Sequence, residues 1–229
     1  MKLEAIILDY DQTLVNSLKR FYQTLNDCLS FFKLSTISYD LFLELYTRDM
    51  LNVLIPANVN KSEFWSFFLS TFEKSPLIFS SLMPKAKEIL QELKRIGLKI
   101  GVITGRLTSQ DKLKNELVYF GIYRFIDALA TRLAAGGEFS PKTKMRTLCI
   151  VMDRLKVKPE KCAVVGDYHE DMIAARELGA LPIGVLSGLM SSESLKKAGA
   201  RFIINDISEL PLLIKQYIEL KLEANEASF

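Results

Sequence analysis

The stretch AIILDYDQTL, residues 5–14, decides how the rest of the chain is interpreted. Its apolar run, residues 5–8, is typical of a parallel strand buried on both faces. In open α/β sheets, ligands bind at the carboxyl ends of such strands. Asp9 and Asp11 follow the run directly, and residues two apart on an extended backbone point to the same side. We therefore predict two carboxylates at the mouth of a site for catalysis, metal binding or both.

Composition favours a globular protein with a large core. The chain has 229 residues, which suffices for one large domain or for a core domain with a smaller insert. Apolar residues make up 49% of it, which argues against disorder. The formal net charge of +3 is small and the basic residues are spread along the chain, so we expect no nucleic-acid partner.

The cysteines and the hydropathy of the chain indicate in which cellular compartment we expect the protein. The three cysteines have no metal-ligand spacing, and an odd number fits reduced thiols better than a disulfide framework. The N-terminus lacks a signal-peptide layout, and no apolar run approaches the roughly 18 residues that a spanning helix needs. We therefore expect a cytoplasmic protein with no membrane partner.

Two patterns divide the chain. Residues 16–82 have apolar residues at helical spacing, interrupted at Pro56 and Pro76, and contain no convincing strand. From Pro84 onward, strand-like and helix-like segments alternate, which indicates a parallel sheet. We predict a doubly wound, Rossmann-like α/β core of residues 1–15 and 83–229, interrupted by an all-helical domain of residues 16–82.

Further polar residues end predicted strands of this core. Thr104 ends one strand and Asp167 ends another, so both should meet Asp9 and Asp11 at one edge of the sheet. Asp171 lies four residues after Asp167, about one helical turn away. Several carboxylates in one crevice suit a hard cation such as Mg²⁺ better than zinc.

Four segments resemble the motifs of the haloacid dehalogenase superfamily of phosphohydrolases. They are DYDQT at 9–13, VITGR at 102–106, SPKTK at 140–144 and VVGDYHED at 164–171. Their order and spacing match that superfamily, and the segments after residue 166 resemble its phosphoglycolate-phosphatase-like branch. The helical insert matches the cap domain of that branch. The second aspartate favours phosphate esters over haloacids, because dehalogenases have no alkoxide to protonate.

The resemblance implies a role for each residue. Asp9 would be the nucleophile that accepts the phosphoryl group, and Asp11 would be the general acid and base. Thr104, the backbone N–H of Gly105 and Lys142 would hold the phosphoryl oxygens. The partner would be a small phosphorylated substrate.

The resemblance also implies the metal ligands. Asp9, Asp167 and the backbone carbonyl of Asp11 would bind Mg²⁺, and Asp171 would bind it directly or through water.

The lysine motif offers two candidates. A gap-free alignment on the acidic motif places Lys142 on the family's lysine and Lys144 where proline is usual. Pro141 suits a helix start, which is a favourable place for phosphate. We therefore predict Lys142 for the site.

Other residues near the motifs are predicted to have lesser roles. Gln12 stands where the family most often has glycine, so that turn should be less open. We expect His169 at the rim of the site and not in catalysis. Arg106 and Arg132 could steer an anionic substrate, although solvated surface arginines are commoner. The cluster of Phe64, Trp65, Phe67 and Phe68 is expected to form the core of the helical insert.

Several functions remain open alongside a magnesium-dependent phosphatase. Phosphoglucomutase-like phosphoryl transfer would use the same four motifs, and phosphonate hydrolysis would need a lysine from the insert, such as Lys19 or Lys33. Outside the enzymes of this superfamily, a phospho-aspartate signalling receiver would be much shorter, and a metabolite-binding relative would have lost a key group. Neither the substrate nor the oligomeric state can be read from the sequence.

Overall fold

The structure is a computed structural model that describes residues 3–138, 141–188 and 190–226. The chain divides into two compact units. One comprises Met1–Val15 and Leu82–Phe229, and the other comprises Asn16–Ser81. The chain passes from one unit to the other at β2 (Val15–Asn16) and returns at β3 (Ser81–Leu82), and these two short strands pair with each other.

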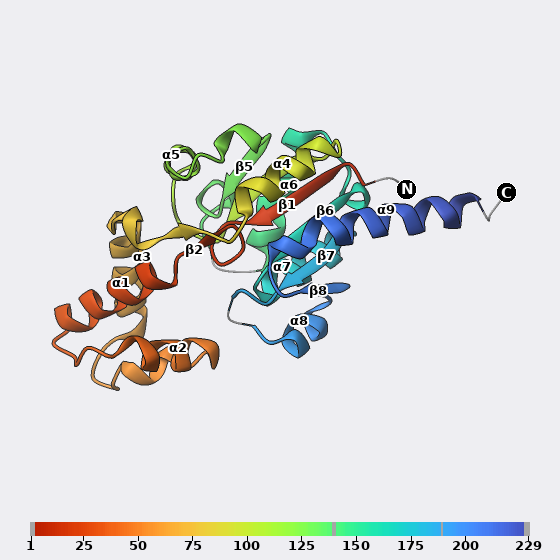
Figure 1. Cartoon of the computed structure of the whole chain (residues 1–229). Coiled ribbons are helices and arrows are strands. Elements are labelled where there is room, and N and C mark those ends of the chain that lie inside the picture. Colours follow the sequence, from red (N-terminus) through yellow and green to blue (C-terminus); the bar gives the residue numbers. More distant parts are fainter. Residues whose placement is uncertain (1–2, 139–140, 189, 227–229) are drawn as a thin grey trace. The chain divides into compact units, whose positions relative to one another are not determined.

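The larger unit is built on a six-stranded sheet, in which every pair of neighbouring strands is parallel (Figure 1). The order is β5-β4-β1-β6-β7-β8. The strands are β1 (Ala5–Asp9), β4 (Lys99–Thr104), β5 (Ala128–Thr131), β6 (Cys162–Gly166), β7 (Leu181–Val185) and β8 (Phe202–Ile204). The order reverses direction at β1, so the carboxyl end of β1 lies at the topological switch point where such sheets bind ligands.

Helices cover both faces of this sheet. They are α4 (Ala86–Arg95), α5 (Gln110–Tyr119), α6 (Pro141–Leu155), α7 (His169–Leu178), α8 (Ser192–Ala198) and α9 (Leu210–Glu226). Short 3₁₀ turns connect the elements: η3 (Tyr123–Phe125), η4 (Leu133–Ala135), η5 (Pro159–Lys161) and η6 (Ile207–Glu209). The predicted parallel, doubly wound α/β class is confirmed.

Strand β1 shows why its sequence is apolar without alternation. Ile6 and Leu8 point into a core shared with α4, α5 and α9, whereas Ala5 and Ile7 point into a second core shared with α6 and α7. All four side chains are fully buried. Burial on both faces requires apolar residues at consecutive positions, which is the pattern that predicted this strand.

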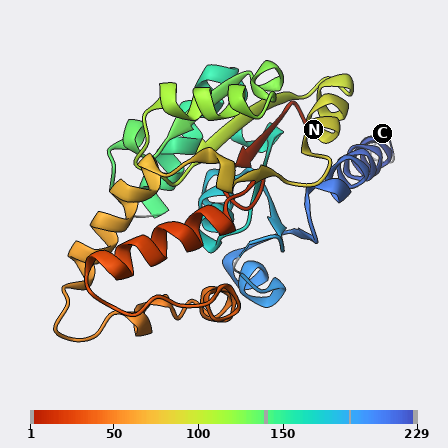
Figure 2. The same cartoon turned by 60° about the vertical axis from the view of Figure 1, so that its left-hand side comes forward.

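The smaller unit is helical, as predicted. It contains α1 (Leu18–Phe31), α2 (Tyr39–Thr47) and α3 (Lys61–Lys74), with 3₁₀ turns η1 (Leu51–Leu54) and η2 (Leu77–Phe79). Helices α1 and α3 pack against each other (Figure 2). Phe64 and Phe68 are buried, and Trp65 and Phe67 pack on the same cluster, so the predicted aromatic core is confirmed.

Capping side chains fix where two of these helices begin. Ser38 accepts a hydrogen bond from the N–H of Leu41 at the start of α2, and Asn60 accepts from Ser62 and Glu63 at the start of α3. Ser17 occupies the N-cap position of α1, but its side chain makes no capping bond. No helix among the described residues is long and apolar enough to cross a membrane.

Candidate active site

The turn after β1 presents the first two carboxylates. Asp9 is the last residue of β1 and is buried, and Asp11 follows two residues later with 25% of its side chain exposed. The N–H groups of Leu14 and Val15 both donate to the carbonyl oxygen of Tyr10, which closes the turn. Parallel pairing sets Asp9 beside Ile103, so the adjacent Thr104 comes to the same edge of the sheet.

The same turn contains Gln12, whose backbone conformation is uncommon for a residue other than glycine. Gln12 has φ of +58°, the left-handed conformation that glycine adopts most readily. Its carbonyl oxygen accepts a hydrogen bond from Ser187 Oγ at 2.5 Å, in the loop after β7. Gln12 therefore adopts a backbone conformation that suits glycine, the residue most often found at this position in the family that the sequence resembles. The hydrogen bond from Ser187 holds it in that conformation.

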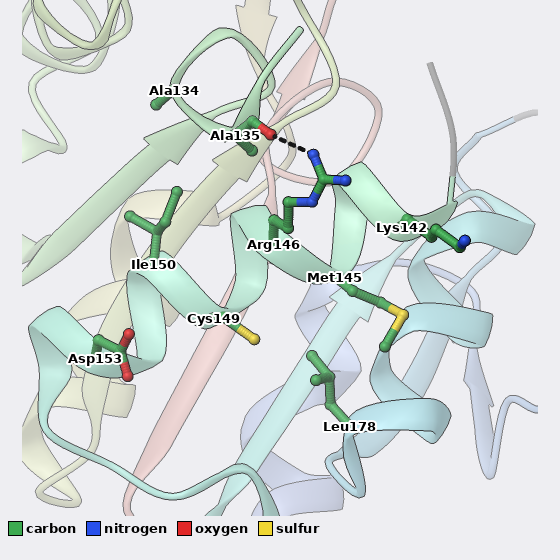
Figure 3. Close-up of a pocket in the computed structure, with 9 residues that line it drawn as sticks. All are labelled: Ala134, Ala135, Lys142, Met145, Arg146, Cys149, Ile150, Asp153 and Leu178. Atoms are coloured by element: carbon green, nitrogen blue, oxygen red, sulfur yellow. Dashed lines mark hydrogen bonds between the residues drawn. The ribbon is translucent and has the colours of Figure 1, made fainter. Parts of the chain in front are cut away.

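The structure corrects the choice of lysine. Nζ of Lys144 lies 2.8 Å from Oδ1 of Asp9 and 2.6 Å from Oδ1 of Asp171, and its side chain is only 10% exposed. Lys142 is exposed instead, and the prediction that it enters the site is wrong. Lys142 lines a groove of about 610 Å³. Figure 3 shows its side chain there, together with Met145 and Cys149.

Helix geometry explains the error. Helix α6 begins at Pro141, so Lys142 and Lys144 both belong to it. Residues two apart on a helix point about 200° away from each other, so only one of them can face β1. Because Lys144 contacts Asp9 on β1 and Asp171 on α7, Lys142 necessarily points elsewhere.

The remaining two carboxylates come from β6 and α7. Asp167 directly follows β6 and is buried, and Asp171 lies in the first turn of α7 with 0% exposure. Oδ2 of Asp171 accepts a hydrogen bond of 3.3 Å from the N–H of Tyr168, which fixes the side chain against the start of its own helix.

Two glycines leave space for these carboxylates, and the sequence analysis did not identify them as parts of the site. A Cβ added at Gly188 would lie 1.9 Å from Oδ2 of Asp167. One added at Gly166 would lie 2.4 Å from Cγ of Asp171. The signal available in the sequence was a glycine just before Asp167 and another shortly after the strand that follows.

Buried negative charge dominates the electrostatics. Burial raises the pKa of Asp9 to about 7; Lys144 opposes this rise, and Asp171 and Asp11 add to it. Burial, with the neighbouring Asp9 and Asp171, also raises the pKa of Asp167 well above its usual range. Burial alone would lower the pKa of Lys144, but Asp171 and Asp9 raise it.

This charge balance bears on whether a metal fits. When ionised, the carboxylates of Asp9, Asp167 and Asp171 carry more negative charge than the single ammonium of Lys144 neutralises, so the donor set suits a hard divalent cation with oxygen ligands. Within the described part of the chain, however, no three His, Cys, Asp or Glu side chains form a ready-made cluster for a metal ion. Lys144 contacts two of the carboxylates directly.

Thr104 and Gly105 lie next to this cluster. Thr104 is buried, and its Oγ1 lies 3.5 Å from Oδ2 of Asp11. The N–H of Arg106 donates to the same Oγ1 at 3.2 Å. A Cβ added at Gly105 would meet no described atom within 4 Å, so the backbone there is open to a bound group.

The two arginines near the motifs differ from the solvated residues that the sequence suggested. Arg106 and Arg132 are 7% and 6% exposed. The N–H of Arg132 donates to the carbonyl oxygen of Thr104 at 3.0 Å. Burial lowers the pKa of Arg132, and Glu170 opposes that shift. His169 begins α7, and its ring lies 4.1 Å from that of Tyr168.

Comparison with known proteins shows which proteins the chain is similar to in sequence. The chain is 25% identical to a phosphoglycolate phosphatase of Haemophilus influenzae over 227 residues, covering 91% of this chain and 97% of that one. It is 31% identical to a glyceraldehyde 3-phosphate phosphatase of Methanocaldococcus jannaschii over 134 residues, covering 58% of this chain and 56% of the other.

A solved structure shows the same fold. A solved structure of a haloacid dehalogenase-like family hydrolase from Streptococcus pneumoniae matches with a TM-score of 0.75 and 18% identity, covering 94% of this chain and 98% of the other. Residues 6–185 match the sequence family described as haloacid dehalogenase-like hydrolase, which is most of the chain. The predicted resemblance is confirmed, and the chain belongs to the haloacid dehalogenase-like hydrolase family.

Proposed function

We propose that the protein is a magnesium-dependent phosphatase that hydrolyses a small phosphorylated metabolite through a phosphoryl-aspartate at Asp9. The observation that carries the proposal is the pairing of Asp9 with Lys144 at the carboxyl edge of β1, next to Asp11 and Thr104. This is a buried nucleophile held by a cation, with a second carboxyl group two residues away. The names of the relatives above supply the substrate class.

In the first step, a carboxylate oxygen of Asp9 attacks phosphorus and the bond from phosphorus to the ester oxygen breaks. Asp11 donates its proton to the departing oxygen, so that an alcohol leaves and not an alkoxide. Lys144, Thr104 Oγ1 and the Gly105 N–H stabilise the charge on the phosphoryl oxygens.

In the second step, the roles of the pair reverse. The carboxylate of Asp11 takes a proton from water, and the oxygen of that water forms a bond to phosphorus. The bond between phosphorus and Asp9 breaks, which releases inorganic phosphate and restores both carboxyl groups to their starting states. The chemistry needs two carboxyl groups in different environments, and Asp9 is buried whereas Asp11 is partly exposed.

Asp9, the backbone carbonyl of Asp11, Asp167 and Asp171 would hold Mg²⁺, which, when bound, would neutralise charge on the phosphoryl group. The contact of Lys144 with Asp171 supports a second role for that aspartate. Asp171 holds the ammonium group against Asp9, and it would do so whether it binds the metal directly or through water.

The resemblance assigns substrate choice to the helical domain of residues 16–82, which this proposal retains. Its aromatic core explains how the insert folds but does not identify a ligand. The class of substrate is therefore drawn from the names of the relatives.

The decisive experiment measures phosphate release from an aryl phosphate and from a panel of phosphorylated metabolites, with Mg²⁺ and with excess chelator. We expect release only with Mg²⁺, and none from Asp9→Asn, which cannot form the intermediate. Asp153→Asn is the matched control, because Asp153 lies on α6 beside the groove of Figure 3 and outside the site. Full activity with chelator or in Asp9→Asn would contradict the proposal.

A further inference from the structure

Arg106 is buried although it follows the threonine motif at the edge of the active site. Its side chain is 8% exposed, so it is not available to attract substrate from solution. Its guanidinium lies over the ring of Tyr10, with Cζ 5.1 Å from the ring centroid. Tyr10 lies between Asp9 and Asp11 in the chain, so a guanidinium packed on its ring is expected to act within the site.

The partner of this guanidinium comes from another helix. Nη2 of Arg106 donates to Oε2 of Glu116 at 2.7 Å, and the Glu116 side chain is 3% exposed. Glu116 lies on the buried side of α5, together with Leu113 and Leu117. Burying such a pair costs desolvation energy that the attraction does not reliably recover, so stability alone is a weak explanation for it.

The same arginine reaches the second carboxylate of the site. Nε of Arg106 lies 3.6 Å from Oδ2 of Asp11. The backbone N–H of Arg106 donates to Thr104 Oγ1, which lies 3.5 Å from that same oxygen. Arg106 therefore approaches Asp11 Oδ2 in two ways, through its side chain directly and through its backbone by way of Thr104.

We propose that Arg106 is a positioning residue that holds the carboxyl group of Asp11 toward the departing oxygen, with Glu116 as its anchor. The inference rests on the proposed function, because it assigns a means of orientation to the acid and base of that reaction. Glu116 also balances the charge of Arg106, so the pair orients Asp11 without adding a net positive charge beside it.

The test uses the way in which the reaction rate depends on the leaving group of the ester. An aryl phosphate leaves with little protonation, whereas an alkyl phosphate needs the proton from Asp11. We compare kcat/KM for p-nitrophenyl phosphate with kcat/KM for the alkyl phosphate that the wild type hydrolyses fastest. The double variant Arg106→Gln/Glu116→Gln removes both charges together and leaves no buried ion unpaired.

We expect the double variant to lose roughly 10- to 100-fold on the alkyl ester and only a few-fold on the aryl ester, as displacement of a catalytic group by about 1 Å does. Arg106→Lys keeps a positive charge beside Glu116 but removes the contact between Nε and Asp11. It should show a smaller loss with the same selectivity for the alkyl ester. The matched control is Arg95→Gln/Glu92→Gln, a pair on α4 with side chains 68% and 26% exposed, near the opposite end of the sheet, which should change neither rate.

Equal losses on both esters, or no loss, in folded Arg106 variants would overturn the inference. Asp11→Asn separates this failure from failure of the proposed function, since it should show the strongest selective loss of all. If Asp11→Asn is selective and the Arg106 variants are not, only the positioning role is wrong. If Asp11→Asn is not selective, the acid role of Asp11 and the inference built on it are both wrong.

Discussion

The ammonium group of Lys144 lies 2.6 Å from Oδ1 of Asp171, and this ion pair joins the N-terminal end of α6 to the first turn of α7. Asp171 has 0% exposure and Lys144 also contacts Asp9. Asp171 therefore helps to hold the positive charge of Lys144 at the end of β1. The approach of α6 to α7 thus determines which lysine serves the candidate nucleophile.

The first prediction compares the two lysines of the same motif. Lys144→Ala should lower kcat on an aryl phosphate by on the order of a hundredfold or more, because it removes a preorganised positive charge from the phosphoryl site. Lys142→Ala is the matched control, and its kcat should stay within about threefold of wild type, because Lys142 is exposed. A dead Lys142 variant beside an active Lys144 variant would refute the assignment.

The second prediction concerns metal binding measured without turnover. Mg²⁺ at about 100 times its dissociation constant should stabilise the folded protein by about 2.7 kcal/mol, since the proposed ligands Asp9, Asp167 and Asp171 come to one edge of the sheet only in the folded state. The melting temperature of chelator-treated protein should rise by several degrees on adding MgCl₂. Asp167→Asn should lose most of that rise, and sodium chloride at equal ionic strength should not reproduce it. An identical rise in wild type and variant would place the ion elsewhere.

The third prediction concerns the glycine beside Asp167. Gly188→Ala should reduce kcat at least about tenfold, because the new methyl group would lie 1.9 Å from Oδ2 of Asp167 and must displace that carboxylate. Gly97→Ala is the control. Gly97 has φ of +87° and no described atom within 4 Å of an added Cβ, so the change should cost about 1–2 kcal/mol of stability and leave kcat unchanged. Full activity of Gly188→Ala would show that the loop yields freely.

The fourth prediction concerns the thiols. Cys28 and Cys162 are buried, and burial raises their pKa to about 11 and about 12, whereas Cys149 is partly exposed. A thiol reagent such as DTNB should therefore modify one thiol in the native protein at pH 8 and three after unfolding. Its rate should increase with pH, because burial also raises the pKa of Cys149 and the thiolate is the reactive form. Cys149→Ser should abolish the native reaction. Rapid modification of two or more native thiols would contradict the burial of Cys28 and Cys162.

The apolar runs and the helical periodicity of the sequence predicted the architecture because they reflect burial directly. The apolar run of residues 5–8 is buried on both faces of the sheet, and the helical periodicity of residues 16–82 corresponds to α1, α2 and α3. The carboxyl ends of parallel strands lie at one edge of a sheet whatever the details of packing. For this reason the strand pattern of the sequence alone placed Asp9, Thr104 and Asp167 at the same edge.

Details that depend on rotation and packing required the tertiary structure. Side chains two residues apart on a helix point in directions that differ by about 200°. The start of α6 and its contact with α7 therefore had to be known to select Lys144 over Lys142. The burial of Arg106 depends on Glu116, ten residues away on α5, which no local pattern links to the site. The sequence by itself determined the sheet, the helical insert and the edge at which the carboxylates meet, because periodicity and strand order decide these. Only the tertiary structure decided which cations reach those carboxylates, because that depends on how separate helices pack against the sheet.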